Sequence, residues 1–359
     1  MTTKKTETEI LALGIETSCD DTACAVVTGR GEVLSSVVSS QLAAHRPYGG
    51  VVPEIASREH LENWPAVSTA ALHEAGIALR DVDVVAATKG PGLIGSLLVG
   101  LSLGKSIAYG LGVSFQAVNH LEGHLYSPFL RVDSEAAETP PERFVGLIVS
   151  GGHTTVVEVA DGSFETLAET RDDAMGEVFD KVGKSLKLPY PQGPVVDGLA
   201  ELGKADEKKF SIARFSDGSL DFSYSGLKSQ TLLEIRKLAD QGVDTDLSDF
   251  ESVSPANAVL DLLASFRAGA VAQIIDRLER LLARHRFGMV AVSGGVAANR
   301  LLRPRLEQWG RQNEVDIRLV PMVYAGDNAA MIAYAGIRRL RMGIEDDPRR
   351  ADAASRLPF

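Results

Sequence analysis

The chain has 359 residues, of which 45% are hydrophobic and 24% are charged. These values are ordinary for a globular protein, and the length predicts two domains with a core of their own. No apolar run of membrane-spanning length is evident, and the segment after Met1 lacks the apolar centre of a signal peptide. The spacing of Cys19 and Cys24 fits neither a zinc site nor a C-x-x-C motif. We therefore expect two reduced cysteines in a cytoplasmic protein that does not act at a membrane.

The formal net charge of −11 argues against a protein that binds nucleic acid unaided. Phosphate neutralisation supplies most of the affinity in such proteins, which are normally basic. Any contact with nucleic acid must then rely on a local basic patch or on a partner protein. Two groups of arginines are candidate patches, although a solvated helix face is the favoured interpretation of each residue taken singly: Arg300, Arg303 and Arg305, and Arg338, Arg339 and Arg341.

The predicted elements repeat along the chain. The first set comprises strands over 10–16, 22–28 and 33–39, a helix over 56–75, a strand over 83–88, a helix over 97–110 and a strand over 113–118. The second set comprises strands over 144–149, 154–159 and 164–169, a helix over 260–285, and strands over 289–292 and 317–320. Two copies of one strand–turn–strand–turn–strand unit predict duplicated α/β domains facing each other across a cleft.

The run Asn119-His120-Leu121-Glu122-Gly123-His124 follows the strand over 113–118. On a helix, His120 and His124 project from one face one turn apart, close enough to share a metal ion. The end of a strand is also where open α/β sheets bind ligands. The alternative is a pair of half-buried helix histidines bonded to their neighbours.

A zinc peptidase is disfavoured by the position of the acid in this run. In the H-E-x-x-H motif the glutamate directly follows the first histidine and stays near the metal. Here Glu122 comes two residues after His120, a rotation of about 200° around a helix. It points away from the pair, so the motif does not support a peptidase.

A third ligand is needed, because two imidazoles rarely hold a catalytic ion alone. Asp327 lies at a predicted helix N-cap after the strand over 317–320, and capping is its alternative role. A set of His120, His124 and Asp327 with open positions would suit Fe(II) or Zn(II).

Glycine-rich turns over 90–95, 150–152 and 293–295 follow predicted strands. Glycine lets a backbone approach a ligand closely, and amides at the start of a helix suit phosphate. None of the turns has the P-loop or dinucleotide pattern. Two such turns in a duplicated fold favour a nucleotide held between them. Gly193 and two acidic residues, Asp180 and Asp197, lie between these turns in sequence. The two carboxylates could accept hydrogen bonds from ribose hydroxyls or amines, and solvation at the surface is their alternative role.

Six segments of the chain form recognisable motifs, at 14–21, 119–124, 149–154, 222–228, 293–300 and 326–333. Together they resemble the tRNA N6-adenosine threonylcarbamoyltransferase family of the bacterial TsaD type, formerly described as an O-sialoglycoprotein endopeptidase. The resemblance runs from about residue 9 to residue 340. Two departures are Ala325-Gly326, where the family usually has Cys-Thr, and Gln192, where it usually has Gly. Neither departure removes a ligand side chain.

The resemblance implies the duplicated, RNase H-like α/β fold of actin, sugar kinases and heat-shock chaperones, with a cleft between the domains. The expected limits are a first domain at 9–130 completed by 325–345, a second at 143–324 with a mobile insertion at 203–250, and tails at 1–8 and 346–359.

The resemblance also implies the site. His120, His124 and Asp327 are the expected metal ligands, with Fe(II) ahead of Zn(II). We add Glu16, at the end of the first strand, as a candidate for proton handling or for ordering a metal-bound water. The expected substrate-binding residues are Ile148, Val149, Ser150, Gly151, Gly152, Asp180, Gly193, Asp197 and Asn299.

The implied reaction transfers the threonylcarbamoyl group of threonylcarbamoyl-AMP to N6 of the adenosine 3′ of the anticodon, in tRNAs that read codons beginning with A. The implied protein partners are a paralogous inactive subunit of the TsaB type and a small P-loop ATPase of the TsaE type. Three alternatives stay open: a kinase or nucleotide hydrolase of the same fold, a nucleotide-responsive scaffold without turnover, and the disfavoured metallopeptidase.

Overall fold

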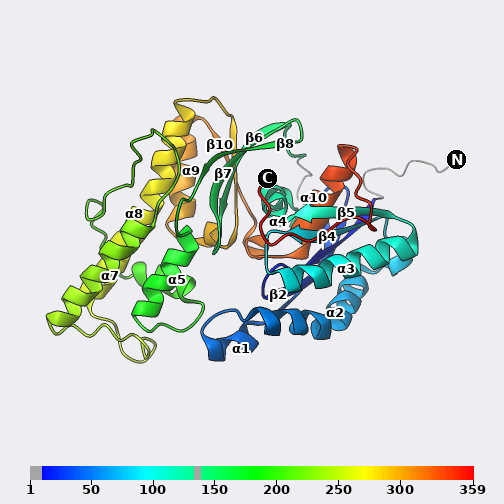
Figure 1. Cartoon of the computed structure of the whole chain (residues 1–359). Coiled ribbons are helices and arrows are strands. Elements are labelled where there is room, and N and C mark those ends of the chain that lie inside the picture. The colour runs from blue at the N-terminus through cyan, green and yellow to red at the C-terminus, as the bar shows by residue number, and fades with distance from the viewer. Residues whose placement is uncertain (1–9, 133–138) are drawn as a thin grey trace. The chain divides into compact units, whose positions relative to one another are not determined.

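The computed structural model describes residues 10–132 and 139–359. Of these, residues 10–132, 139–142 and 320–359 form one compact unit, and residues 143–319 form the other. Each unit is built around a mixed five-stranded sheet, and Figure 1 shows the course of the chain through its elements.

The strands of the first unit are β1 (Leu11–Glu16), β2 (Asp21–Thr28), β3 (Val33–Ser40), β4 (Val84–Gly90) and β5 (Ser114–Asn119). Its helices are α1 (Leu42–His45), α2 (Pro53–Ala75), α3 (Ile94–Leu111), α4 (His120–Tyr126) and α10 (Ala329–Arg341), with short 3-10 turns η1 (Arg46–Tyr48), η2 (Leu79–Asp81), η3 (Ser127–Phe129) and η5 (Met322–Tyr324).

The strands of the second unit are β6 (Arg143–Val149), β7 (Thr154–Ala160), β8 (Ser163–Glu169), β9 (Met289–Ser293) and β10 (Asp316–Leu319). Its helices are α5 (Met175–Ser185), α6 (Gln192–Ala200), α7 (Ser225–Asp240), α8 (Asn257–Leu282) and α9 (Leu302–Asn313), with the 3-10 turn η4 (Gly295–Ala298).

The two sheets have the same topology. The strand order is β3-β2-β1-β4-β5 in the first and β8-β7-β6-β9-β10 in the second. β1 pairs antiparallel with β2 and parallel with β4, and β6 pairs in the same way with β7 and β9. The prediction of a duplicated α/β fold is therefore confirmed at the level of strand order and direction.

The central strands of the first sheet are apolar on both faces because helices cover both. Leu13 and Ile15 of β1 belong to a buried cluster with residues of α2 and α3, such as Val67 and Leu101. On the opposite face α10 packs against β1 so closely that a Cβ at Gly14 would lie 2.0 Å from the Ala329 carbonyl oxygen. This glycine brings the start of α10 down onto the sheet.

Residues 346–359, which the sequence assigned to a tail, lie against the first unit. The amide of Ala117 donates to Asp346 Oδ2 at 2.9 Å, and the amide of Ala354 donates to the Lys89 carbonyl at 2.8 Å. The side-chain amide of Asn119 donates to the Pro358 carbonyl at 3.1 Å. The segment thus runs along the ends of β4 and β5.

The expected insertion at 203–250 contains the helix α7. The amide of Ser225, at the start of this helix, donates to Asp172 Oδ1 at 3.2 Å, and the Ser225 hydroxyl donates to Oδ2 at 2.7 Å. A carboxylate that accepts these bonds stabilises the first turn of a helix. α7 packs against α5 and α8 of its own unit.

Two helices are long and apolar enough to cross a membrane, whereas no such run was expected from the sequence. They are α3 and α8, and 33% and 78% of the 18-residue apolar windows are buried, respectively. The buried core helix of a globular protein has the same length and composition, so this finding is weak evidence for a membrane span.

Candidate metal centre and nucleotide-binding residues

The side chains of the candidate metal centre gather at one edge of the first sheet. β1, β4 and β5 run parallel, so their carboxyl ends meet at that edge. Glu16 is the last residue of β1, and His120 directly follows β5. Asn119 starts the helix α4, because its Oδ1 accepts the amide of Leu121 at 2.9 Å. The strand order thereby carries the histidine helix to the end of the sheet where ligands bind in open α/β folds.

His120, His124 and Asp327 converge on one point. Their ligand atoms all lie within 4.8 Å of one another. Asp327 Oδ1 lies 3.5 Å from His120 Nε2 and 3.2 Å from His124 Nε2. The two imidazoles are one helical turn apart with ring centroids at 4.7 Å. The sequence-predicted ligand set is thus brought together within one unit.

The surroundings of the two imidazoles suit a cation. His124 is fully buried, and neither of its ring nitrogens has a well-aligned hydrogen-bond partner in the described part of the chain. An unpaired polar atom in a protein interior is costly, and a metal ligand bond would satisfy it. Two histidines and one carboxylate with open positions are typical of Fe(II) sites and also fit a catalytic Zn(II) site.

Glu16 fixes the orientation of His120. Its Oε2 lies 3.0 Å from His120 Nδ1, and since a carboxylate only accepts, Nδ1 carries the proton in this bond. In the neutral ring, which is the form that binds a metal, the other nitrogen, Nε2, then carries the lone pair, and it faces His124 and Asp327. Carboxylate partners of this kind set the tautomer and ring orientation of metal-binding histidines.

Glu16 is itself held by its neighbours and is 1% exposed. Its Oε1 accepts the amide of Ser18, and its Oε2 accepts the hydroxyl of Thr88 at 2.6 Å. With the bond to His120, three of its about four acceptor positions are filled by the protein, and its burial favours a positioning role over proton transfer to a substrate. The sequence analysis missed Thr88, which only the pairing of β1 with β4 brings next to Glu16.

The helix α10 is capped by Asn328 and not by Asp327. Asn328 Oδ1 accepts the amide of Met331 at 2.9 Å, and Asn328 has the extended backbone of an N-cap residue. The capping role considered for Asp327 is therefore wrong. Because the next residue caps the helix, the carboxylate of Asp327 is available to the two histidines.

The electrostatics of the cluster are those of a cation site. Burial lowers the pKa of His120, but the carboxylates of Asp327 and Glu16 outweigh burial and hold that pKa well above its usual range. Burial raises the pKa of Asp327, and there the two imidazoles outweigh it and hold the pKa well below its usual range. The negative field that favours a proton on His120 would equally favour a bound cation.

Glu122 has no part in this cluster. Its Oε2 lies 3.2 Å from Arg339 NH1, and its side chain is 3% exposed. The carboxylate of a zinc peptidase would have to face the metal ligands. The geometry agrees with the helical argument against a peptidase.

In the second unit, the turns at 150–152 and 293–295 follow neighbouring parallel strands. Ile148 of β6 pairs with Ser293 of β9, so the turns after the two strands lie together. Gly294 has a φ of +90°, and a Cβ there would lie 2.3 Å from the Val149 carbonyl oxygen. Only glycine permits this approach. Ile148 and Val149 are buried in β6, and Ser150 forms the turn through its hydroxyl, which accepts the amide of His153 at 3.1 Å.

Gly151 and Gly152 are the exposed part of this turn. A Cβ added at either glycine would meet no atom within 4 Å. The peptide backbone there is accessible to a ligand, which suits a contact between backbone amides and phosphate.

Asp180 and Gly193 are bonded to each other. Asp180 Oδ1 accepts the amide of Gly193, in the first turn of α6, at 2.7 Å. Burial raises the pKa of Asp180, partly offset by hydrogen bonds from the amides of Gly193 and Gln192. The carboxylate thus stabilises the N-terminus of α6.

Asp197 and Asn299 are also bonded to each other, although they are far apart in the sequence. Asn299 Nδ2 donates to Asp197 Oδ1 at 2.8 Å, and the amide of Arg300 donates to Asp197 Oδ2 at 3.1 Å. Asn299 Oδ1 accepts the amides of Leu301 and Leu302 and so orders the start of α9. α6 carries both Gly193 and Asp197, so four of the predicted substrate residues form a connected set: Asp180, Gly193, Asp197 and Asn299.

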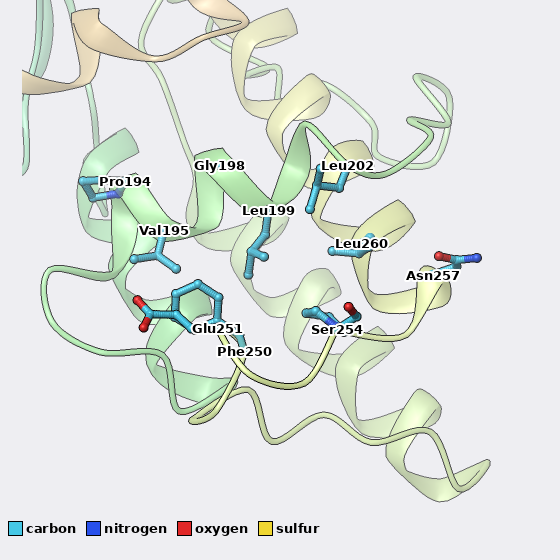
Figure 2. A pocket seen from close by; sticks show the side chains of 11 residues that line it. Pro194, Val195, Gly198, Leu199, Leu202, Phe250, Glu251, Ser254, Asn257 and Leu260 are labelled. Carbon is cyan, nitrogen blue, oxygen red and sulfur yellow. The ribbon is translucent and has the colours of Figure 1, made fainter.

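A separate cavity of about 580 Å³ in the second unit contains none of the predicted substrate residues. Figure 2 shows its mainly apolar lining, with side chains such as Leu199, Phe250 and Leu260. A nucleotide site needs convergent donors and acceptors. The cavity is therefore not the candidate nucleotide site.

Comparisons with known proteins agree on one family. A sequence model described as tRNA N6-adenosine threonylcarbamoyltransferase (TsaD) matches residues 32–334. The chain is 46% identical over 340 residues to the tRNA N6-adenosine threonylcarbamoyltransferase of Salinibacter ruber, covering 94% of this chain and 97% of that protein. It is 45% identical over 351 residues to the enzyme of that name from Syntrophobacter fumaroxidans, covering 97% and 99%.

Solved structures support the fold alone. HypF from T. kodakarensis is 16% identical with a TM-score of 0.59, over 94% of this chain and 48% of that one. A full-length HypF in a phosphate- and nucleotide-bound form is 15% identical with a TM-score of 0.58, over 94% and 47%. With identities of 40% and above over nearly the whole chain, the sequence relatives decide the assignment. The chain belongs to the tRNA N6-adenosine threonylcarbamoyltransferase family.

Proposed function

We propose how the residues of this chain carry out the activity of the family, which is transfer of a threonylcarbamoyl group to N6 of an adenosine in tRNA. The donor is threonylcarbamoyl-AMP, and the acceptor is the adenosine 3′ of the anticodon in tRNAs that read codons beginning with A. The observation that carries the proposal is the convergence of His120, His124 and Asp327 within 4.8 Å. A family match alone would not say which groups act.

His120, His124 and Asp327 hold one divalent metal ion, with Fe(II) preferred to Zn(II). When bound, the metal would supply a Lewis acid for the carbamoyl carbonyl, which a weakly nucleophilic exocyclic amine needs. Glu16 keeps the His120 ring in place through Nδ1. The burial of His124 excludes water from one side of the site and strengthens electrostatic interactions there.

The second unit holds the adenylate. The exposed backbone at Gly151 and Gly152 binds the phosphate of the donor. This phosphate belongs to the AMP that leaves when the threonylcarbamoyl group is transferred. Ile148, Val149 and Ser150 fix the path of that turn. Asp180, Gly193, Asp197 and Asn299 bind the rest of the nucleotide, with the carboxylates as acceptors for hydroxyl groups.

The chain works with partners in the cytoplasm. A net charge of −11 makes tight binding of tRNA by this chain alone unfavourable. We therefore assign tRNA presentation and turnover to a complex with a paralogous inactive subunit of the TsaB type and a small P-loop ATPase of the TsaE type.

The test is mass analysis of nucleosides from tRNA incubated with this protein, threonylcarbamoyl-AMP and the two partner proteins. We expect threonylcarbamoyladenosine in tRNAs that read codons beginning with A. Omission of this chain serves as the control. Product that forms equally well without it, or none in the complete mixture, would contradict the proposal.

A further inference from the structure

Arg267 is a charged residue in the middle of the most buried helix of the second unit. Its neighbours on α8, Phe266 and Ala268, are buried, and Arg267 itself is 6% exposed. A buried guanidinium is costly unless it is paired and hydrogen-bonded. Its position therefore calls for a specific partner.

The partner is the end of α6. Arg267 Nη1 donates to the Asp197 carboxylate at 3.1 Å and to the Asp197 carbonyl at 3.1 Å. Nη2 donates to the Ala200 carbonyl at 3.3 Å, and Nη1 lies 2.6 Å from Glu201 Oε1. One guanidinium thus holds both the side chain and the backbone of the helix that carries Asp197.

Asp197 is the point where these contacts meet. Its Oδ1 accepts from Arg267 and from Asn299, and its Oδ2 accepts the Arg300 amide. A carboxylate has about four acceptor positions. The hydrogen bonds within the described residues fill three, which leaves one position on Oδ2 for a ligand.

We infer that Arg267 is the positioning residue for the nucleotide site: it fixes the Asp197 carboxylate so that its remaining acceptor position can bind the AMP part of the donor. The inference rests on the nucleotide role proposed for Asp197. Arg267 itself does not contact the substrate. It places a positive charge beside the buried carboxylate and supplies a fork of donors that sets the direction of that carboxylate.

The experiment is calorimetric titration of the full-length protein with AMP. We expect Asp197→Asn and Arg267→Gln each to lower AMP affinity by about tenfold or more, which is the size of one charge-assisted contact. The double variant should bind AMP no more weakly than the weaker-binding single variant. The losses of affinity are non-additive when two residues act through one contact. If Arg267→Gln instead weakened binding through a general loss of structure, its effect would add to that of Asp197→Asn.

Arg277 provides a matched control on the same helix. It is 1% exposed and bonds to the Asp221 carbonyl, with no contact to Asp197. Arg277→Gln should lower thermal stability to a similar degree but leave AMP affinity unchanged. Arg267→Lys, which keeps the charge and loses the fork, should give an intermediate affinity and replaces Arg267→Gln if that variant does not fold.

The possible outcomes distinguish the inference about Arg267 from the proposed nucleotide role of Asp197, on which it rests. If Asp197→Asn binds AMP normally, the proposed nucleotide role of Asp197 is wrong and the inference falls with it. If Asp197→Asn weakens binding but Arg267→Gln and Arg267→Lys do not, the nucleotide role stands and the inference alone is overturned. Additive losses, or an equal loss in Arg277→Gln, would also overturn it.

Discussion

The two units of this protein have sheets of the same topology, but different residues lie at the carboxyl edges of the two sheets. In the first, β1 ends in the buried acid Glu16 and β5 leads into the histidine helix α4. In the second unit, the equivalent strand β6 ends at Val149 and is followed by a glycine-rich turn. β9 ends at Ser293 and is followed by a second glycine-rich turn. The duplicated sheet provides the same edge twice. The residues that follow each strand decide whether that edge suits a cation or a phosphate.

The comparison predicts that metal binding depends on the first unit alone. We expect His120→Ala and His124→Ala each to lose the metal and the transferase activity while remaining folded. The loss of metal affinity should exceed the roughly 10–100-fold decrease that is typical when only a hydrogen-bond partner of a metal ligand is removed. Elemental analysis with circular dichroism measures both. His73→Ala, at an exposed position on α2, is the control. Full metal content in both ligand variants would refute the assignment.

The converse prediction concerns the glycine turn of the second unit. Gly152→Val should abolish binding of a non-hydrolysable adenylate analogue, because the new side chain fills the space that the phosphate needs. The same space contains no protein atom within 4 Å, so the fold should be unaffected. The metal should stay bound, because its ligands all lie in the first unit.

Gly288 offers a control for this variant. It precedes β9 at the opposite end of the strand, and a Cβ there also meets nothing within 4 Å. Gly288→Val should bind the analogue normally. If calorimetry gave unchanged affinity for Gly152→Val, the nucleotide would have to bind elsewhere.

A third prediction tests whether Glu16 acts through His120. Glu16→Gln should lower metal affinity roughly 10–100-fold, as expected for loss of a carboxylate that orients a metal-binding imidazole. Glu16→Ala should lower it at least as much, because the amide of Ser18 and the hydroxyl of Thr88 then also lose their acceptor. Competition with a chelator measures the affinity without reference to turnover. Equal metal affinity in the unaltered protein and in both variants would show that Glu16 has another role.

The sequence predicted the repeated sheets and the histidine pair because both depend on local periodicity. Strands of alternating or continuous apolar residues, and two histidines four residues apart, can be recognised without knowing what packs against them. The boundaries of β1 and α2 were within three residues of those observed. Asp327, far from the pair in the sequence, was inferred from its place at a predicted helix start after a strand, and the resemblance to a family then implied the same ligand.

The remaining features depend on contacts between distant segments. Asp327 and Asn328 are both good capping residues, so only the backbone of α10 decides which one caps it. Thr88 reaches Glu16 because of the register between β1 and β4. Arg267 interrupts an apolar stretch of the sequence, which indicates a buried partner but does not say which residue it is.

The smallest expected effect concerns Asn299, which supports the nucleotide residues and a helix at once. Asn299→Ala removes one hydrogen bond to Asp197, while Arg267 and the Arg300 amide still hold that carboxylate. The free energy of nucleotide binding should therefore weaken only slightly, by an amount in the lower part of the range of about 1–3 kcal/mol expected for a lost buried contact. The variant also loses the acceptor for the amides of Leu301 and Leu302, so the free energy of unfolding should drop by about 1 kcal/mol. Asn299→Asp separates the two roles, because it keeps the acceptor at the start of α9 but sets a second buried carboxylate against Asp197. The repulsion should outweigh the retained cap, so denaturant unfolding and calorimetry should show a lower stability and a poorer nucleotide affinity than in Asn299→Ala. The reverse order would mean that Asn299 acts on the second unit only as a helix cap.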